Sequence, residues 1–106
     1  MKNQIEQDVF AAIADPTRRE LLRLLSKEEE LPLYRITDHF EIGRTAVSKH
    51  LTVLKAANLV YDRKEGRETR YRANTRPLKV VRDWLSYYEV FWNENILQLK
   101  KILEEE

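Results

Sequence analysis

The chain has 106 residues, a length that suits one domain spanning residues 1–106 and leaves no room for a second, catalytic domain. Hydrophobic residues make up 42% and charged residues 35%, which excludes a disordered chain, and the lack of cysteine excludes disulfides and thiolate chemistry. The net charge is +1, no apolar run approaches a membrane span, and the first residues lack the apolar core of a secretory signal. We therefore expect a cytoplasmic protein without a membrane partner.

The first predicted element is a short amphipathic helix that ends near Ala14. Its apolar residues recur at spacings of three and four: Ile5, Val9, Phe10 and Ile13. Asp15 and Pro16 then predict the start of a second helix, because an Asp side chain accepts hydrogen bonds from first-turn amides and Pro lacks the N–H that would be unpaired there. The wide apolar face of this helix comprises Leu21, Leu22, Leu24 and Leu25, and residues 28–32 end it.

Two helices joined by a short turn are predicted over residues 33–56. The first begins near Leu33, and residues 41–43 interrupt its apolar pattern before the second begins at Arg44. The inward stripe of the second helix comprises Val47, Leu51 and Leu54. Helices separated by so few residues cross steeply, which is the helix-turn-helix geometry, and its second helix is the one presented to the DNA major groove.

The pattern changes to alternation over residues 59–73, which predicts a β-hairpin that turns at Glu65 and Gly66, with Arg70 and Arg72 on one exposed face. A last helix is predicted over residues 78–104. Its apolar residues step by three or four, as in a coiled-coil seam: Leu78, Val81, Leu85, Tyr88, Trp92, Ile96, Leu99 and Leu103. The predicted fold class is mainly α with a small β-hairpin: four helices, two strands that form a wing, and one helix.

Charge is divided unevenly along the chain. Residues 44–82 contain eleven basic and three acidic residues, a balance of +8, whereas the rest of the chain carries −7. This polarity suits a module that lays one basic surface on a polyanion such as double-stranded DNA while the acidic remainder is repelled. Ordinary solvated surface charge is the alternative.

The polar side of the second helix of the pair offers the candidate contacts to DNA bases. Arg and Lys pair with guanine acceptors, and Ser and Thr are small, adaptable donors. The candidates are Arg44, Thr45, Ser48, Lys49 and His50. His50 lies beside the buried edge, so a packed histidine bonded to the backbone is as consistent with the sequence as a phosphate contact. His39 is expected to be structural or on the surface.

The hairpin offers a second set of DNA contacts. Its cations are expected to position the protein through phosphates, with Arg67 at the tip best placed for the minor groove. The set comprises Arg63, Lys64, Arg67, Arg70 and Arg72. For any one of these side chains, a solvated surface role is the alternative.

Several runs of sequence resemble the ArsR-type (ArsR/SmtB) winged-helix repressors, and the match spans nearly the whole chain. They are residues 10–19 (FAAIADPTRR), residues 44–51 (RTAVSKHL) with Val53 and Leu54, and Gly66-Arg67 followed by Tyr71. The resemblance implies a dimeric transcriptional repressor that binds imperfect palindromes, with the first and last helices forming the dimer interface. The side chains expected at that interface are Ile5, Val9, Leu85, Tyr88, Trp92, Ile96 and Leu99.

The chain departs from the family pattern in two places. Glu41 and Gly43 stand where family members often have Gly and Ser, so the N-cap of the recognition helix differs. The metal-sensing members use a cysteine pair in the third helix or His, Asp and Glu ligands along the last. Residues 31–37 hold no Cys and residues 78–106 no His, so we expect no cofactor, no metal site and no metal response through those positions. The acids of the last helix are interpreted as solvated surface: Asp83, Glu89 and Glu94.

Half of the chain's aromatic residues fall within one short stretch of the last helix: Trp84, Tyr87, Tyr88, Phe91 and Trp92. One side of an isolated helix cannot bury so many rings, which predicts that a second subunit covers them. A pocket for an apolar effector between subunits is the alternative.

The sequence thus predicts a sequence-specific DNA-binding regulator, a homodimeric repressor or autorepressor of bacterial type on an inverted-repeat operator. An enzyme is not expected, because no nucleophile, base and acid stand in a suggestive arrangement. A winged helix that binds protein or RNA is the rival interpretation, since a fold does not dictate its partner. An effector protein or a small molecule stays open as the signal that releases the DNA.

Overall fold

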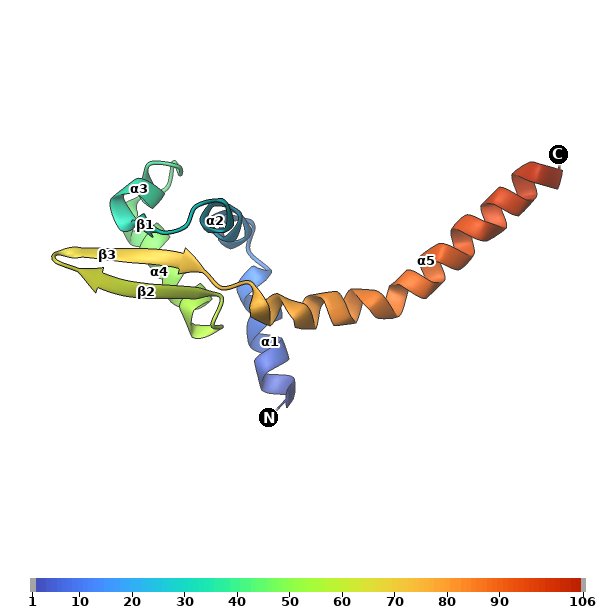
Figure 1. Cartoon of the computed structure of the whole chain (residues 1–106), viewed down its shortest axis with the longest axis horizontal. Coiled ribbons are helices and arrows are strands. Elements are labelled where there is room, and N and C mark those ends of the chain that lie inside the picture. The colour runs from blue at the N-terminus through green and yellow to red at the C-terminus, as the bar shows by residue number, and fades with distance from the viewer. Residues whose placement is uncertain (1, 106) are drawn as a thin grey trace.

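The computed structural model describes residues 2–105, with side chains described for residues 8–95 and 98–105 (Figure 1). The elements follow the chain in this order: α1 (Lys2–Ile13), α2 (Pro16–Lys27), β1 (Leu31–Pro32), α3 (Leu33–Thr37), α4 (Arg44–Ala56), β2 (Val60–Glu65), β3 (Glu68–Ala73), the 3₁₀ turn η1 (Arg76–Leu78) and α5 (Lys79–Glu105). The predicted fold class, mainly helical with a small antiparallel sheet, is confirmed.

α2 begins where the sequence predicts. Pro16 is its first residue, and the Asp15 carboxylate accepts hydrogen bonds from the backbone N–H groups of Thr17 (2.7 Å) and Arg18 (3.2 Å). Partial burial of this carboxylate raises its pKa, but the two hydrogen bonds and the neighbouring positive charge together outweigh this effect, so the pKa of Asp15 lies below its ordinary value. The cap therefore fixes the place at which the chain turns from α1 into α2.

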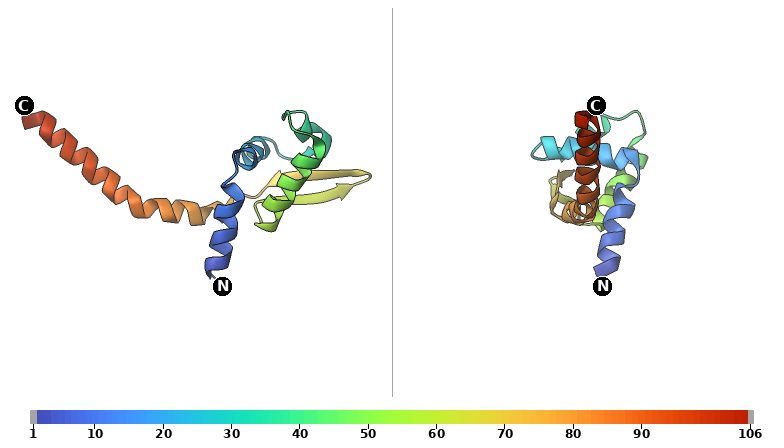
Figure 2. Two further views of the ribbon diagram at one scale, coloured as in Figure 1. Left: turned by 180° about the vertical axis from the view of Figure 1, so that it is seen from behind. Right: turned by 90° about the vertical axis from the view of Figure 1, so that its right-hand side faces the viewer.

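The core lies where α2, α3, α4 and the inner face of the sheet meet. The largest fully buried side chains come from α1, from these parts and from the turn after α4: Val9, Leu21, Leu25, Ile36, Val47, Leu51, Leu54, Leu59 and Val60. α4 crosses the hairpin, as Figure 2 shows from behind. Because α4 turns its apolar stripe toward the core, its polar side is left to solvent.

The sheet has three antiparallel strands in the order β1-β3-β2, one more than the predicted hairpin. β1 is only two residues long, and its Leu31 and Pro32 pair with Tyr71 and Arg70 of β3. So short a strand leaves no alternation to detect in the sequence, and Pro is tolerated because β1 is an edge strand.

β2 and β3 form the predicted hairpin and pair along their whole length. Gly66 and Arg67 make the turn, and the φ of +64° at Gly66 is a conformation that glycine adopts at little cost. Arg70 and Arg72 share the outer face, as predicted, because strand residues alternate and the buried Tyr71 between them marks the inner face.

The turn between α3 and α4 is longer than predicted. α3 ends at Thr37, so residues 38–43 separate the two helices. The N–H groups of His39 and Phe40 bond to carbonyls three residues back, at 3.0 and 3.1 Å, and this turns the chain out of the helix. Phe40 lies beyond the end of α3 but still packs against the core. Its spacing from Ile36 therefore predicted a core contact correctly, although the residue is not helical.

α4 ends in a Schellman motif, which sets where the wing begins. Asn58 has a φ of +62°, and the N–H of Leu59 bonds to the carbonyl of Leu54 at 2.9 Å. The side-chain Nδ2 of Asn74 donates to the carbonyl of Asn58 at 2.7 Å, which ties the end of β3 to the end of α4. The wing and the helix are therefore joined at their bases.

α5 extends away from the body as a helix of 27 residues (Figure 1). The molecule is elongated as a result, with extents of 67 × 34 × 22 Å. α5 packs against α1 near its own start, where the rings of Phe10 and Trp84 meet. Within the described chain, no helix is both long and apolar enough to cross a membrane.

Candidate nucleic-acid interface

α4 presents its polar side to solvent. Arg44, Thr45 and Lys49 are exposed, and Ser48 is half-buried. Among the described side chains, those of residues 8–95 and 98–105, no ion pair engages Arg44 or Lys49. Their charges are therefore free to meet a polyanion.

The start of α4 lacks a side-chain cap. Gly43 is the N-cap residue, with φ −70° and ψ 164°, and its carbonyl accepts from the N–H of Val47 at 3.1 Å. The remaining first-turn amides have no capping side chain, and such groups favour a nearby anion. The expected departure from the family pattern at Gly43 thus falls on the N-cap itself.

A hollow of about 200 Å³ opens between α3, the start of α4 and the tip of the wing. Arg44 of α4 and Arg67 of the turn both line it, although they are far apart in the sequence. Tyr34 of α3, 57% exposed, lines it as well. Tyr34 was not predicted from the sequence, because one exposed aromatic residue on a short helix forms no periodic pattern.

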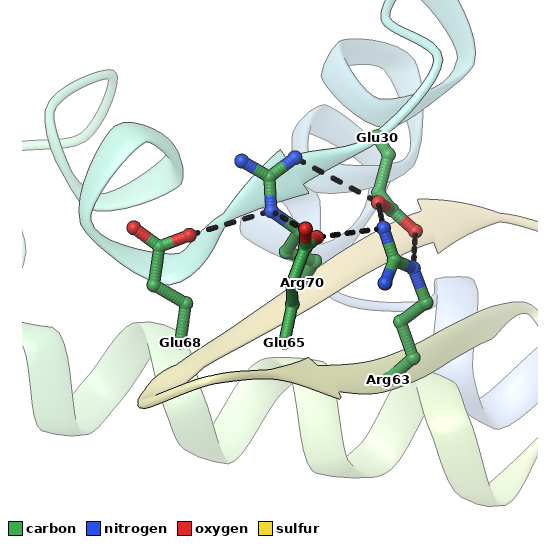
Figure 3. Close-up of polar contacts among 5 residues, drawn as sticks. All are labelled: Glu30, Arg63, Glu65, Glu68 and Arg70. Carbon is green, nitrogen blue, oxygen red and sulfur yellow. Dashed lines mark hydrogen bonds and ion pairs between the residues drawn. The ribbon is translucent and has the colours of Figure 1, made fainter.

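The outer face of the wing carries five charged side chains that contact one another (Figure 3). They are Glu30, Arg63, Glu65, Glu68 and Arg70, here called the wing cluster. Glu30 accepts two hydrogen bonds from Arg63, 2.9 Å from Nε and 2.7 Å from Nη2, and lies 3.7 Å from Nη1 of Arg70. Glu65 lies 2.9 Å from Arg63 and 3.4 Å from Arg70, and Glu68 lies 3.3 Å from Arg70.

The wing cluster changes the expected role of two arginines. Arg63 and Arg70 were predicted to hold phosphates, yet both are paired with acids of their own chain. The hydrogen bond from Arg63 holds the pKa of Glu30 below its ordinary value, and the same bond raises the pKa of Arg63. Three acids against two arginines give the wing cluster a net negative charge, and with Arg72 the outer face of the hairpin is balanced in charge rather than basic.

Sequence reasoning missed Glu30. An acidic residue in the polar loop after a helix belongs to no motif, and it meets Arg63, which is 33 residues away, because β1 pairs with β3. Only the edge pairing of a two-residue strand brings these groups together.

The other wing cations lie elsewhere. The guanidinium of Arg72 lies over the ring of Tyr61, its cross-strand neighbour, with 4.8 Å between the guanidinium carbon and the ring centroid. Lys64 and Arg67 are exposed near the tip, and no ion pair with a side chain that the structure describes engages them. Lys64 points to the inner side of the hairpin, where α4 lies, because it alternates with Arg63.

The wing is also tied to α4 on its inner side. Nζ of Lys55 donates to Oδ2 of Asp62 at 3.0 Å, which joins the last turn of α4 to β2. Tyr71 lies beside this contact, and burial, together with the negative charge of Asp62, raises its pKa. The hairpin and the helix are therefore held in one relative position by the core and by this ion pair.

His50 lies on a different flank of α4 from Lys55. It is half-buried, and its Nδ1 lies 3.3 Å from Nη1 of Arg18, near the start of α2. The partner of the ring is thus a side chain rather than the backbone partner considered from the sequence. His39 is exposed, and its Nδ1 lies 2.9 Å from the carbonyl oxygen of Arg35.

α5 carries an apolar surface that is open to solvent. The residues expected at a dimer interface are exposed to these degrees: Leu85 37%, Tyr88 37%, Trp92 50% and Leu99 59%. The prediction that Val9 lies at the dimer interface is wrong. Val9 is only 1% exposed in the single chain, so it has no surface left to contact a partner. The side chains of Ile5 and Ile96, also expected there, lie outside the described residues.

The acids of α5 are scattered. Asp83 lies 3.7 Å from its neighbour Arg82, and both side chains are about 70% exposed. In the part of the chain that the structure describes, no three His, Asp or Glu side chains gather as metal ligands do.

Comparison with known proteins agrees with this geometry. Residues 15–62 match the family model described as "Bacterial regulatory protein, arsR family". The chain is 38% identical over 78 residues to the transcriptional repressor SdpR of Bacillus subtilis, a match that covers 74% of this chain and 86% of that protein.

Two solved structures extend the similarity to the fold. An ArsR-like transcriptional regulator from Rhodococcus sp. RHA1 superimposes with a TM-score of 0.71 at 32% identity, over 95% of this chain and 94% of that one. The ArsR family transcriptional regulator RHA00566 gives a TM-score of 0.75 at 25% identity, over 86% and 93%. The fold and the exposed polar helix therefore define a winged helix-turn-helix transcriptional regulator that binds DNA. The chain belongs to the ArsR family, whose members regulate transcription and are not enzymes.

Proposed function

We infer that this regulator is a homodimeric repressor that occupies an inverted-repeat operator and blocks transcription sterically. The observation that carries this inference is the hollow bordered by both Arg44 and Arg67, next to the exposed polar side of α4. A duplex laid against α4 meets the helix in its major groove and the wing tip at the adjacent backbone.

The contacts divide into two kinds. On α4, Arg44 and Lys49 bind guanine acceptors or phosphates, while Thr45 and Ser48 set the approach of the helix to the bases. At the wing tip, Lys64 and Arg67 hold phosphates, with Arg67 nearest the minor groove. Arg63 and Arg70 remain in the wing cluster and brace the hairpin.

The exposed apolar surface of α5 supports the dimer. Contiguous apolar patches on a soluble protein mark interaction sites, and rings such as that of Trp92 contribute large buried areas to an interface. A two-fold dimer through α1 and α5 presents two copies of α4 to one duplex. Successive major grooves are roughly 34 Å apart, so the operator is an inverted repeat with that spacing.

Fluorescence anisotropy tests the operator. The full chain is titrated into a labelled duplex of its own upstream region and into a scrambled duplex of the same composition. We expect tighter binding to the upstream duplex, and a loss of that preference in Arg44→Ala. Lys100→Ala, which changes an exposed residue of α5, serves as the control, and we expect it to retain the preference for the upstream duplex. Equal affinity for both duplexes rejects sequence-specific repression.

The same titration tests metal response. Zinc is added to the complex and a chelator afterwards. Residues 31–37 contain no cysteine and residues 78–106 contain no histidine, so the side chains that bind metal in the metal-sensing relatives are missing. The operator affinity is therefore expected to stay unchanged in both steps. An affinity that zinc lowers and the chelator restores contradicts this expectation.

A further inference from the structure

Arg18 joins three helices through one guanidinium group. Its Nε donates to the carbonyl oxygen of Ala12 at 2.6 Å and its Nη2 to that of Ala11 at 3.1 Å. These carbonyls belong to the last turns of α1, where helix carbonyls lack partners within the helix. The third nitrogen, Nη1, lies 3.3 Å from Nδ1 of His50 on α4.

The chemistry of this contact constrains the histidine tautomer. An arginine side chain only donates hydrogen bonds and stays positively charged, so a hydrogen bond here needs Nδ1 of His50 as the acceptor. The tautomer that offers this acceptor carries its proton on Nε2. Asp15, whose Oδ2 lies 4.0 Å from the same Nη1, is the acidic group beside the pair, and α1 contributes the two backbone carbonyls.

Protonation of His50 removes this contact. Both ring nitrogens then carry hydrogen, and two positive charges face each other across the same 3.3 Å. The guanidinium cannot turn away freely, because its other two nitrogens are bonded to the carbonyls of α1. The ring of His50 must move instead, and α4 loses its tether on this flank.

We propose that Arg18 and His50 form a positioning link between α1 and the recognition helix α4, and that His50 serves DNA binding as a neutral acceptor rather than as a charged phosphate contact. The proposal rests on the operator binding described above. On its other flank α4 is joined to the wing through Lys55 and Asp62. Since α1 packs on α5, the link relates the angle of α4 to the proposed dimer surface.

The two roles of His50 predict opposite responses to acid. Histidine changes its charge between about pH 5 and 8. A neutral acceptor is lost on acidification, so the preference for the operator over scrambled DNA falls. A phosphate contact gains charge on acidification, so binding rises.

Anisotropy titrations of the full chain at about pH 8 and about pH 5.5 separate these roles, because they bracket the histidine titration. The variants are His50→Ala, which removes the acceptor, and His50→Asn, whose amide oxygen takes the place of Nδ1 without titrating in this range. His39→Asn is the matched control, since the chain has only these two histidines.

For wild type and His39→Asn, we expect the ratio of operator affinity to scrambled-DNA affinity to fall about tenfold at the lower pH. This factor corresponds to the loss of one hydrogen bond to a charged group. His50→Ala loses a similar factor already at the higher pH, and His50→Asn recovers most of it and no longer responds to acid. A circular dichroism spectrum and melting curve of each variant show that it is folded.

Three outcomes overturn the link. They are a wild-type preference that rises with acid, an acid response that survives in His50→Asn, and a His50→Asn variant as weak as His50→Ala. Failure of the operator inference looks different, because wild type then binds scrambled DNA equally well at both pH values. Arg18→Lys gives an independent check: it keeps the charge but not the three-way fork, and we expect it to weaken the preference as His50→Ala does.

Discussion

The ring of Phe10 in α1 meets the ring of Trp84 in α5 edge to face, with centroids 5.6 Å apart and planes at 80°. Trp84 in turn contacts Tyr88 at 5.4 Å, so aromatic contacts run from the first helix along the last. Edge-to-face rings have a preferred geometry. The contact therefore sets the direction in which α5 leaves the body, and with it the position of the proposed dimer surface.

Removing two apolar side chains from that surface is expected to dissociate the dimer. Leu85→Ala with Trp92→Ala takes away large contacts that are exposed in the single chain. Truncating a central interface residue costs about 2 kcal/mol or more, which raises the dimer Kd roughly thirtyfold for each such residue. Sedimentation equilibrium measures the change. Glu94→Ala, a change of an exposed acidic residue of α5, is the control, and a double variant that stays dimeric places the interface elsewhere.

The salt dependence of DNA binding should distinguish the tip of the wing from the wing cluster. Arg67→Ala removes a cation with no ion pair in the described chain, so the slope of log affinity against log salt should fall by about 0.9. Arg63→Ala removes a cation already paired with Glu30, so the slope should change little. Anisotropy titrations over a range of salt concentrations measure both. Equal changes in the two variants would show that Arg63 leaves its cluster to bind phosphate.

Glu30→Gln should make stability less sensitive to acid. The pKa of Glu30 is lowered in the folded chain by its hydrogen bond from Arg63. Its charge therefore stabilises the fold above the ordinary pKa of an unfolded glutamate, and this contribution is lost as pH falls through the lower, folded pKa. Melting curves should show a lower Tm for the variant at about pH 7 and a difference that closes once acid protonates the carboxylate of the folded protein. Glu29→Gln, outside the wing cluster, is the control, and a gap that persists in acid contradicts the ionic origin.

A serine at the start of α4 should stabilise the protein. Gly43 has an ordinary φ of −70°, and a Cβ there meets no atom within 4 Å. The serine hydroxyl can accept a hydrogen bond from a first-turn amide, so Gly43→Ser should raise the free energy of unfolding by a few tenths of a kcal/mol, about the difference between these caps. Urea unfolding measures it. Gly66→Ser is the contrasting change, because the φ of +64° strains any side chain and should lower stability by about 1 kcal/mol.

The elements that the sequence predicted well are those with local signals. The start of α2 follows from Asp15 and Pro16, because a cap acts on amides two and three residues ahead. The hairpin follows from alternation around Gly66, and α4 from the stripe of Val47, Leu51 and Leu54. Each depends on residues within a few positions of one another, so a single sequence is sufficient to find it.

The features that the sequence did not reveal depend on pairs far apart in the chain. β1 exists because Leu31 and Pro32 reach β3, and that pairing brings Glu30 to Arg63. The turn between α3 and α4 is longer than predicted because hydrogen bonds of the turn type end α3 at Thr37. Phe40 packs against the core beyond that point, so its apolar side chain suggested a longer helix. Val9 has the same pattern whether it faces a partner or its own core, and only its burial distinguished the two.

The sequence by itself therefore determined the family, the order of the helices and the wing, and the residues with a DNA-binding chemistry, because periodicity, caps and charge are properties of neighbouring residues. Tertiary structure decided which cations are free. Arg63 and Arg70 are engaged by acids of the same chain, Arg67 is engaged by none of the described acids, and His50 is held by an arginine 32 residues away. Such pairings depend on how the chain packs in three dimensions, and no local pattern encodes them.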